Sequence, residues 1–348
     1  MIHEGFVRSR NDQSLYVKRN GEKRTYVCTY VDDLLFVGSD KNELSNFITS
    51  MKRRFAIKDL GTVKNFLGIE VRHKEKGVEL SQERFAREIV KEMEMSSCNS
   101  TLLPMSKVDQ MNADPEGISV DATMYQHFVG KLLYLTNTRP DLSYTIGRLA
   151  SFCSDPKESH FWILKKVIRY IKGTMEACLW YPSDRSMEII AYSDSDWAAD
   201  VDDRQSISGS MIFLGNSPVS WTSKKQNSVA KSTTEAEYVA VSNTASQAAW
   251  FGKVLKDLDL SKQRAIQIMC DNQSAILLTK FQTKHKRTRH IDIAFHYVRE
   301  LVERKIVTIN LCRSKSQRAD VLTKPQSFVE LKESREAIGI KIKDNGGK

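Results

Sequence analysis

Two adjacent aspartates, Asp32 and Asp33, stand between two runs of β-branched, aromatic and aliphatic residues in the segment TYVCTYVDDLLFVGSD. The two runs predict a β-hairpin with buried strands. Adjacent carboxylates beside buried strands repel each other and lose solvation, so they are expected to take up a proton or to bind a cation. The pair is therefore a candidate metal site in the N-terminal part of the chain.

A second set of acids recurs at the ends of predicted elements in the C-terminal half. Four carboxylates from different elements repel one another unless divalent cations neutralise them. Two ions about 4 Å apart can activate a water and stabilise the leaving oxygen of a phosphodiester. An all-oxygen site favours Mg²⁺, with Mn²⁺ as an alternative. The four acids are Asp194 and Asp271, which close predicted strands, and Glu237 and Asp320, which lie near the starts of predicted helices.

The segment STTEAE contains two glutamates with different expected roles. Ser232 and Glu235 fit a capping box, in which Glu235 accepts a hydrogen bond from the backbone of the N-cap residue. Glu237 has no role in the cap and points about 200° around the helix from Glu235, so we expect it to face the site. A further acidic run is interpreted as a solvated turn: Asp196, Asp200, Asp202 and Asp203.

The elements that must position these acids alternate between strands and helices. From residue 187 the predicted order is β-β-β-α-β-α-α-β-α, which combines an antiparallel meander with βα units. Upstream, the sequence predicts the hairpin, a helix that starts at Asp40, a second hairpin around Gly77 and a polar linker over about residues 103–121. Helices then follow, packed through Phe128, Leu132, Leu135, Ile146, Leu149, Ile163, Val167 and Ile171. The fold class is therefore α/β (α+β).

Composition limits the partners and the compartment. The 348 residues are 41% hydrophobic and carry a formal net charge of +10, which favours a nucleic acid over a membrane surface as the partner. The six cysteines are scattered without CxxC spacing, so a reducing compartment is expected. The start of the chain has no apolar leader, and no apolar run reaches the roughly 18 residues of a membrane span.

Many stretches resemble one known family. In the C-terminal half, AYSDSDWAADVDDRQSISG, SWTSKKQ, KSTTEAEYVA, CDNQSAI, RTRHIDIAFHYVRE and ADVLTKP closely resemble the ribonuclease H domain of copia-type retrotransposon Pol polyproteins. Upstream, YVDDLLFVGSD, DLGTVKNFLGIEV, LSQERF, VGKLLYLTNTRPDLSY and RYIKGT look like the reverse transcriptase and connecting region of the same family. These stretches follow in the family's order, so the resemblance covers nearly the whole chain up to Pro325.

The resemblance implies a role for each acid. Asp194, Glu237, Asp271 and Asp320 match the D-E-D-D metal ligands of ribonuclease H, and Asp32 and Asp33 match the paired aspartates of the reverse transcriptase YxDD hairpin, a polymerase Mg²⁺ site. Both assignments follow from the family's motifs, and the first agrees with the set chosen from element ends.

The resemblance also implies four segments. Residues 1–104 are expected to be the C-terminal part of a reverse transcriptase, with the palm hairpin and a helical thumb, and residues 105–186 a linker and helical connection. Residues 187–325 are expected to be the ribonuclease H domain, a mixed β-sheet flanked by helices, and residues 326–348 a basic tail. Polymerases of this family carry another aspartate on an earlier strand, and Asp12 lies in a polar setting unlike it, so the polymerase part is expected to be incomplete and inactive alone.

Nucleic-acid contact is predicted from a basic segment, KFQTKHKRTRH, although a solvated loop is the alternative. Its phosphate contacts would add affinity with little sequence readout. Many cellular ribonucleases H have a histidine in a loop before the last carboxylate. This chain has none between Cys312 and Asp320, and His290 and His296 are expected to make packing or polar contacts. The candidate nucleic-acid-binding residues are Lys280, Lys284, Lys286, Arg287 and Arg289.

The predicted function is Mg²⁺-dependent endonucleolytic hydrolysis of RNA in RNA:DNA hybrids, in a retrotransposon Pol fragment. The alternative is a non-catalytic nucleic-acid-binding relic of the polyprotein. The expected partners are a hybrid or other nucleic acid and the rest of the Pol polyprotein, with no membrane. By family the location is the cytoplasm, in virus-like particles, with the nucleus as a second possibility.

Overall fold

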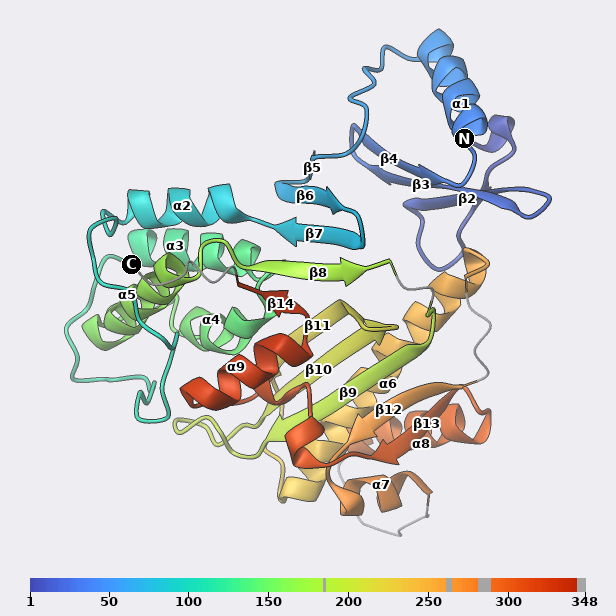
Figure 1. The fold of residues 1–348 in the computed structure, drawn as a ribbon. Helices are drawn as coiled ribbons and strands as arrows, with labels where there is room; N and C mark the ends of the chain where they lie inside the picture. The colour runs from blue at the N-terminus through green and yellow to red at the C-terminus, as the bar shows by residue number, and fades with distance from the viewer. Residues whose placement is uncertain (184–185, 261–264, 281–288, 343–348) are drawn as a thin grey trace.

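The computed structural model describes residues 1–183, 186–260, 265–280 and 289–342, and it describes no side chain between residues 289 and 295. Within these residues the strands form three sheets, one of four strands and two of five. The chain starts beside the four-stranded sheet, and its described part ends just after an edge strand of one of the five-stranded sheets (Figure 1). This mixture of sheets and helices confirms the α/β (α+β) class.

The central sheet has the strand order β11-β10-β9-β12-β13. Strands β9 (Ile189–Asp196), β10 (Ile207–Leu214) and β11 (Ser217–Lys225) form an antiparallel meander. Strands β12 (Ile266–Cys270) and β13 (Val307–Leu311) then extend the sheet in parallel on the other side of β9. This is the ribonuclease H-like mixed sheet that the sequence predicts.

Helices cover both faces of the central sheet. The long helix α6 (Thr233–Asp257) packs on β9, β10 and β12, and α7 (Gln273–Lys280) and α8 (Arg289–Glu303) lie beside it (Figure 1). Side chains alternate along β10, so that Ile212 is buried in the core beneath α6, whereas Met211 and Phe213 are buried in the core on the opposite face. The central sheet is therefore packed between two apolar cores.

The opposite core is built by the helical connection. This core contains α3 (Ala122–Leu135), α4 (Ser143–Ala150), α5 (Glu158–Gly173) and the short helix η2 (Pro140–Leu142), together with α2 (Glu83–Glu92) from the segment before the connection. Seven of the eight apolar positions that the sequence predicts to pack these helices are less than 5% exposed, and Phe128 is 5% exposed. The prediction of a packed helical region is confirmed.

A second five-stranded sheet lies beside these helices, in the order β14-β8-β7-β6-β5. Its strands come from distant parts of the chain. They are β5 (Asn65–Phe66), β6 (Ile69–Lys74), β7 (Gly77–Ser81), β8 (Cys178–Pro182) and β14 (Ile340–Lys341). The sheet therefore joins segments that the sequence assigns to three different domains.

The expected basic tail over residues 326–348 is wrong for its described part. Helix α9 (Phe328–Ala337) begins with a capping box between Ser327 and Glu330, and β14 follows it and pairs with β8. Leu331 and Ile338 of this segment are buried in the core of the helical connection. The segment belongs to the folded body, while the domain boundaries themselves stay predictions.

The N-terminal four-stranded sheet has the order β1-β2-β3-β4. It consists of β1 (Val7–Arg8), β2 (Leu15–Asn20), β3 (Lys23–Tyr30) and β4 (Asp33–Gly38), preceded by the short helix η1 (Ile2–Glu4). Helix α1 (Lys41–Arg54) starts at the predicted N-cap Asp40 and buries Phe47 and Met51 against Phe6 and Val27. The predicted hairpin and the helix after it are both present.

The N-terminal sheet contacts the end of α6 through two aspartates. The Oδ2 atom of Asp257 accepts hydrogen bonds from Ser9 Oγ at 2.7 Å and from the Arg10 amide at 2.8 Å, and Asp259 pairs with Arg24 at 2.8 Å. These hydrogen bonds hold the Asp257 carboxylate charged and keep its pKa below its usual range, against the opposing effect of its burial. The sheet is thus tied to the far end of the helix that carries Glu237.

A search of the described residues for helices long and apolar enough to cross a bilayer finds none.

Candidate active site

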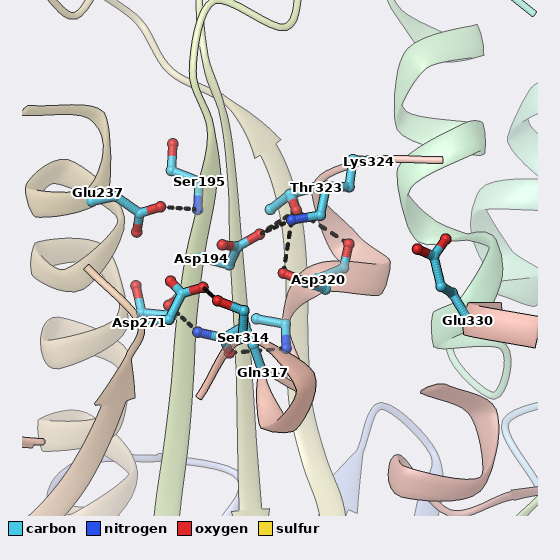
Figure 2. Close-up of polar contacts among 12 residues, drawn as sticks. Asp194, Ser195, Glu237, Asp271, Ser314, Gln317, Asp320, Thr323, Lys324 and Glu330 are labelled. Carbon is cyan, nitrogen blue, oxygen red and sulfur yellow. Dashed lines mark hydrogen bonds and ion pairs between the residues drawn. The ribbon is translucent and has the colours of Figure 1, made fainter. Parts of the chain in front are cut away.

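Parallel pairing of β9 and β12 brings the two strand aspartates to the same level. Met269 lies opposite Tyr192 in the register, so two residues further along Asp271 comes level with Asp194. Asp194 is only 3% exposed, and Asp271 is half-buried just beyond the end of β12. The Ser314 hydroxyl donates a hydrogen bond of 2.8 Å to Asp271 Oδ2, which fixes this carboxylate from the segment after β13 (Figure 2).

Helix α6 directs Glu237 toward the same place. The Ser232 hydroxyl caps the helix by accepting from the Glu235 amide, and Glu235 itself accepts from the Lys231 amide at 3.0 Å, one residue before the predicted partner. Glu237 is 7% exposed, and its Oε1 accepts a hydrogen bond of 3.3 Å from the Ser195 amide. These contacts agree with the predicted roles, in which Glu235 caps the helix and Glu237 faces the site.

Asp320 reaches the cluster from a short 3₁₀ helix, η4 (Asp320–Leu322), rather than from the start of an α-helix as the sequence predicts. The backbone of η4 lies close on β10 because Gly209, which pairs with Asp194, has no side chain. A Cβ atom there would lie 2.7 Å from Thr323 Cγ2 and 3.0 Å from the Ala319 carbonyl oxygen. The missing side chain lets the Thr323 hydroxyl donate a hydrogen bond to Asp194 Oδ2.

Figure 2 shows Asp194 in the middle of the group, with Glu237 and Asp271 on one side and Asp320 on the other. Lys324 also enters on the Asp320 side. Its Nζ lies 2.9 Å from Asp320 Oδ1 and 3.8 Å from Asp194 Oδ2. The structure therefore brings all four predicted acids together around Asp194, with Glu237 coming from α6 on one face of the central sheet and Asp320 from η4 on the other.

Burial and mutual repulsion act on the protonation of these acids. Burial first, and then the charges of Asp194 and Asp271, raise the pKa of Glu237 to about 9. Burial and Asp194 raise the pKa of Asp320 to about 7, against the opposing effect of Lys324. In the protein without bound cations the cluster therefore keeps protons on part of its carboxylates near neutral pH.

Two thiols border the cluster, and neither is predicted from the sequence. Cys270 Sγ lies 4.0 Å from Glu237 Oε2, and ligand atoms of Glu237, Cys270 and Asp271 all lie within 4.8 Å of one another. Cys312 follows β13, and its amide donates to the Cys270 carbonyl oxygen at 3.0 Å. Burial raises the pKa of both thiols, that of Cys312 to about 11. The site is therefore not lined by oxygen alone.

The contacts of three other residues at the site are also not predicted from the sequence, namely those of Ser314, Thr323 and Lys324. Thr323 and Lys324 could have been found from their spacing to Asp320. They follow Asp320 by three and four residues, which places them on the face of the same helical turn.

The acid-rich turn after β9 is not simply solvated. Asp200 is 1% exposed and pairs with Arg148 of α4 and, at 2.6 Å, with Lys225 of β11. Burial raises the pKa of Asp196, which lies near Asp194. Asp202 and Asp203 are exposed, as expected. The turn therefore ties the helical connection to the central sheet, and only its outer acids face solvent.

The paired aspartates of the hairpin have a different setting. Asp32 and Asp33 lie at the turn between β3 and β4, and both are exposed. The neighbouring Val31 is 88% exposed, and strand β4 is an edge strand. The prediction that this pair is desolvated beside buried strands is wrong, because the strands carry the acids out beyond the small core that they cover.

The predicted nucleic-acid-binding residues lie mostly outside the described part. Lys280 is exposed at the end of α7. Lys284, Lys286 and Arg287 lie outside the described residues, and Arg289 and His290 lie where no side chain is described. His296 is exposed on α8. The basic segment therefore stays a prediction.

Comparison with known proteins shows a family for the chain. Residues 1–107 match the family described as reverse transcriptase (RNA-dependent DNA polymerase). Over 97% of its length the chain is 36% identical to a retrovirus-related Pol polyprotein from transposon RE1 of Arabidopsis thaliana, of which it covers 23%. It is 31% identical to a putative transposon Ty5-1 protein of Saccharomyces cerevisiae, matching 69% of this chain and 79% of that protein.

Two solved structures are similar in part. The foamy viral protease-reverse transcriptase in complex with an RNA/DNA hybrid is 12% identical, covers 83% of this chain and 36% of that chain, and has a TM-score of 0.48. LC11-RNase H1 in complex with an RNA/DNA hybrid is 16% identical, covers 39% of this chain and 94% of that chain, and has a TM-score of 0.31.

The chain spans 23% of the length of the Pol polyprotein from transposon RE1. Its reverse-transcriptase match comes first and its ribonuclease H-like sheet follows, in the order that the sequence predicts. The chain belongs to the copia-type retrotransposon Pol family, as a region in which the C-terminal part of a reverse transcriptase precedes a ribonuclease H-like domain.

Proposed function

We propose that this chain hydrolyses the RNA strand of RNA:DNA hybrids with Mg²⁺, at the cluster of Asp194, Glu237, Asp271 and Asp320. The observation that carries the proposal is the convergence of four carboxylates, from β9, α6, the end of β12 and η4, around Asp194. A folded protein gains nothing in stability from such a cluster, because the carboxylates repel one another and lose solvation.

The donor set fits a hard divalent cation. Glu237 and Asp271 offer carboxylate oxygens within 4.8 Å of each other, and Asp194 lies between them and Asp320 (Figure 2). Oxygen donors favour Mg²⁺, and the thiol of Cys270 beside them suits Mn²⁺ better than Mg²⁺. When bound, such ions supply an activated water and charge stabilisation for the leaving oxygen.

The chain's own residues position these groups. The Ser195 amide and the Ser314 hydroxyl hold Glu237 and Asp271, and the Thr323 hydroxyl holds Asp194. In the proposed reaction a water oxygen attacks phosphorus and the bond to the 3′-oxygen breaks. The water loses a proton and becomes part of the 5′-phosphate, and the leaving 3′-oxygen takes up a proton to give a 3′-hydroxyl. Exposed cations such as Lys280 would contact the phosphates of the hybrid without sequence readout.

The reverse-transcriptase part of the chain is expected to be inactive by itself. Among the described residues, a group of three potential metal ligands lies at the central sheet and none of that size lies at the β3–β4 turn. The whole polyprotein's polymerase activity, its assembly with the rest of Pol and its location in virus-like particles remain expectations of the family.

The test is cleavage of an end-labelled RNA:DNA hybrid by the purified chain with Mg²⁺, beside EDTA and beside Asp271→Asn. The proposal predicts cuts in the RNA strand alone, lost with EDTA and in the variant, with 3′-hydroxyl ends. Binding of the hybrid without cleavage, by protein with a cooperative unfolding transition, would overturn it in favour of a nucleic-acid-binding relic.

A further inference from the structure

Lys324 occupies an unusual place for a lysine, inside the acidic cluster. Its Nζ is 2.9 Å from Asp320 Oδ1 and 3.8 Å from Asp194 Oδ2, and its side chain is 43% exposed. Figure 2 shows the ammonium between these two carboxylates. A lysine ammonium is ordinarily a solvated point charge, so its position against two acids needs an explanation.

The backbone around Lys324 is fixed on the sheet. Thr323 donates its hydroxyl to Asp194, and its Cγ2 lies where a Cβ of Gly209 would be, 2.7 Å away. The Lys324 side chain therefore starts from a packed segment beside Asp194.

The two sides of Asp194 are not equivalent. On the Asp320 side, Lys324 supplies a positive charge to both carboxylates. On the other side, the described part of the chain offers Glu237 and Asp271 no ion pair with lysine or arginine, and their oxygens lie with Cys270 Sγ within 4.8 Å. One side of the cluster thus has its own cation and the other does not.

We propose that Lys324 is a positioning residue that substitutes for a divalent cation on the Asp320 side of Asp194. The chain then binds one divalent ion tightly between Asp194, Glu237 and Asp271, and a second one weakly, because the second must displace the ammonium from Asp194 and Asp320. The inference rests on the proposed function for its biological meaning, since it sets the metal concentration at which the two-ion site is complete.

The test is Mn²⁺ binding to the metal-free full chain without nucleic acid, measured by titration calorimetry and by the electron paramagnetic resonance of free Mn²⁺. In the wild type we expect one tight ion and one weak ion. Lys324→Met keeps the length of the side chain and removes its charge, and we expect it to bind the second ion at least about fivefold more tightly, the lower end of ordinary coupling between sites. Lys324→Arg keeps the charge and is expected to bind the second ion as weakly as the wild type.

The matched control is Lys332→Met, which removes an exposed lysine from α9. It is expected to leave both affinities unchanged, which separates a local effect from the loss of one unit of net charge. A merely structural Lys324 would give the opposite sign, because loosening the segment that carries Asp320 weakens metal binding. Unchanged or weaker second-ion affinity in Lys324→Met, or no Mn²⁺ binding by the folded wild type, would overturn the inference.

A second measurement covers the case in which Lys324→Met folds poorly. Lys324→Gln also removes the charge, and the rise in melting temperature between EDTA and Mn²⁺ is expected to be larger in it than in the wild type, while an equal or smaller rise counts against the inference. Neither measurement needs hydrolysis. An inactive chain with the expected affinities would refute the proposed function alone, and an active chain with unchanged affinities would refute the role of Lys324 alone.

Discussion

The molecule holds two groups of acids that resemble metal sites in the sequence, and their surroundings differ completely. Asp32 and Asp33 are neighbours in the chain, yet both are exposed at a turn. Asp194 and Glu237 come from different elements, yet they are 3% and 7% exposed. Adjacent acids can separate into solvent by small rotations of their side chains, whereas acids held by a sheet and a helix cannot. The comparison shows that carboxylates need a cation when strands and helices bring them together in a buried place, and not merely when they are neighbours in the sequence.

The partners of the two groups differ in the same way. Protein donors reach all four acids of the buried cluster, through the Ser195 amide, the Ser314 and Thr323 hydroxyls and the Lys324 ammonium. Within the described residues, no hydrogen bond or ion pair to the side chain of Asp32 or Asp33 is found. A held carboxylate has a fixed geometry and can act in catalysis, while a free one has first to be ordered by something else.

Among the variants that have a matched control on the same element, the largest expected effect is that of Glu237→Gln. Gln keeps the shape of the acid, and because the pKa of Glu237 is raised to about 9, it also matches the neutral form present in the metal-free protein. The melting temperature in EDTA is therefore expected to stay the same, while the rate of hybrid cleavage falls by about 10²–10³-fold through loss of an ionisable metal ligand.

The matched control for this variant is Glu235→Gln. It lies two residues away on the same helix and accepts from the Lys231 amide instead of facing the cluster. Its cleavage rate is expected to equal that of the wild type, with at most a small loss of stability at the helix cap. Equal losses of activity in both variants would contradict the assignment.

The next largest effect is expected on stability, from a change at Asp200. This buried acid also lies in the C-terminal half, but its charge is neutralised by ion pairs with Arg148 and Lys225. Asp200→Asn leaves the buried guanidinium of Arg148 without its partner, so we expect the free energy of unfolding to fall by about 3–5 kcal/mol. The control is Asp203→Asn, which removes an exposed partner of Lys225 and is expected to cost under about 1 kcal/mol. Urea unfolding of both variants checks the difference, and equal losses would refute it.

The ion pairs of Asp200 also predict that the free energy of unfolding depends on pH. Hydrogen bonds from Lys225 and Arg148 outweigh burial and lower the pKa of Asp200 to about 2, below the value of about 3.9 in unfolded chains. A lowered pKa stabilises the folded state above the unfolded value, and this stabilisation is lost as pH falls from about 4 to about 2. The difference in unfolding free energy between wild type and Asp200→Asn is therefore expected to shrink over that range. A constant difference would speak against the ion pair.

Gly209→Ala is expected to have a smaller effect on stability, about 1–3 kcal/mol, because its Cβ would lie 2.7 Å from Thr323 Cγ2 and η4 must move. The movement displaces Asp320 from Asp194, so cleavage is expected to slow by about tenfold or more. Gly130→Ala, on an exposed part of α3 where a Cβ meets nothing within 4 Å, is the control and is expected to gain about 0.5–1 kcal/mol. If both changes leave cleavage unaltered, the close packing of η4 on β10 is not required.

The smallest effect is expected at the hairpin. Replacement of both Asp32 and Asp33 by Asn is predicted to change the unfolding free energy by no more than about 0.5 kcal/mol, as for exposed residues without partners. The rise in melting temperature on adding Mn²⁺ is expected to stay as in the wild type. A loss of that rise would show that the exposed pair, and not only the buried cluster, binds the ion.

The sequence predicts those parts of the site that depend on periodicity and on element ends. Asp194 and Asp271 are found because each follows an apolar strand, and Glu237 because the capping positions of the helix account for Glu235. Two facts about Asp320 do not follow from such patterns. It lies on a 3₁₀ turn, and that turn is seated on the sheet by Gly209, more than one hundred residues earlier in the chain.

The remaining differences have the same physical origin, contact between distant segments. Cys270 and Lys324 join the cluster only because strands and turns far apart in the chain pack together. Burial of Asp200 depends on Arg148 of α4, and Asp32 is exposed because the small N-terminal core ends short of its turn. Local pattern therefore predicts the acids that elements present, while their protonation and partners depend on tertiary packing.

The most direct measurement compares the two acidic groups in one assay, the Mg²⁺-dependent cleavage of a labelled RNA:DNA hybrid by wild type, Asp194→Asn and the Asp32→Asn/Asp33→Asn double variant. The prediction is no detectable cleavage by Asp194→Asn and wild-type cleavage by the double variant. Cleavage that survives in Asp194→Asn, or that disappears in the double variant, would contradict the claim that the buried cluster alone is the hydrolytic site.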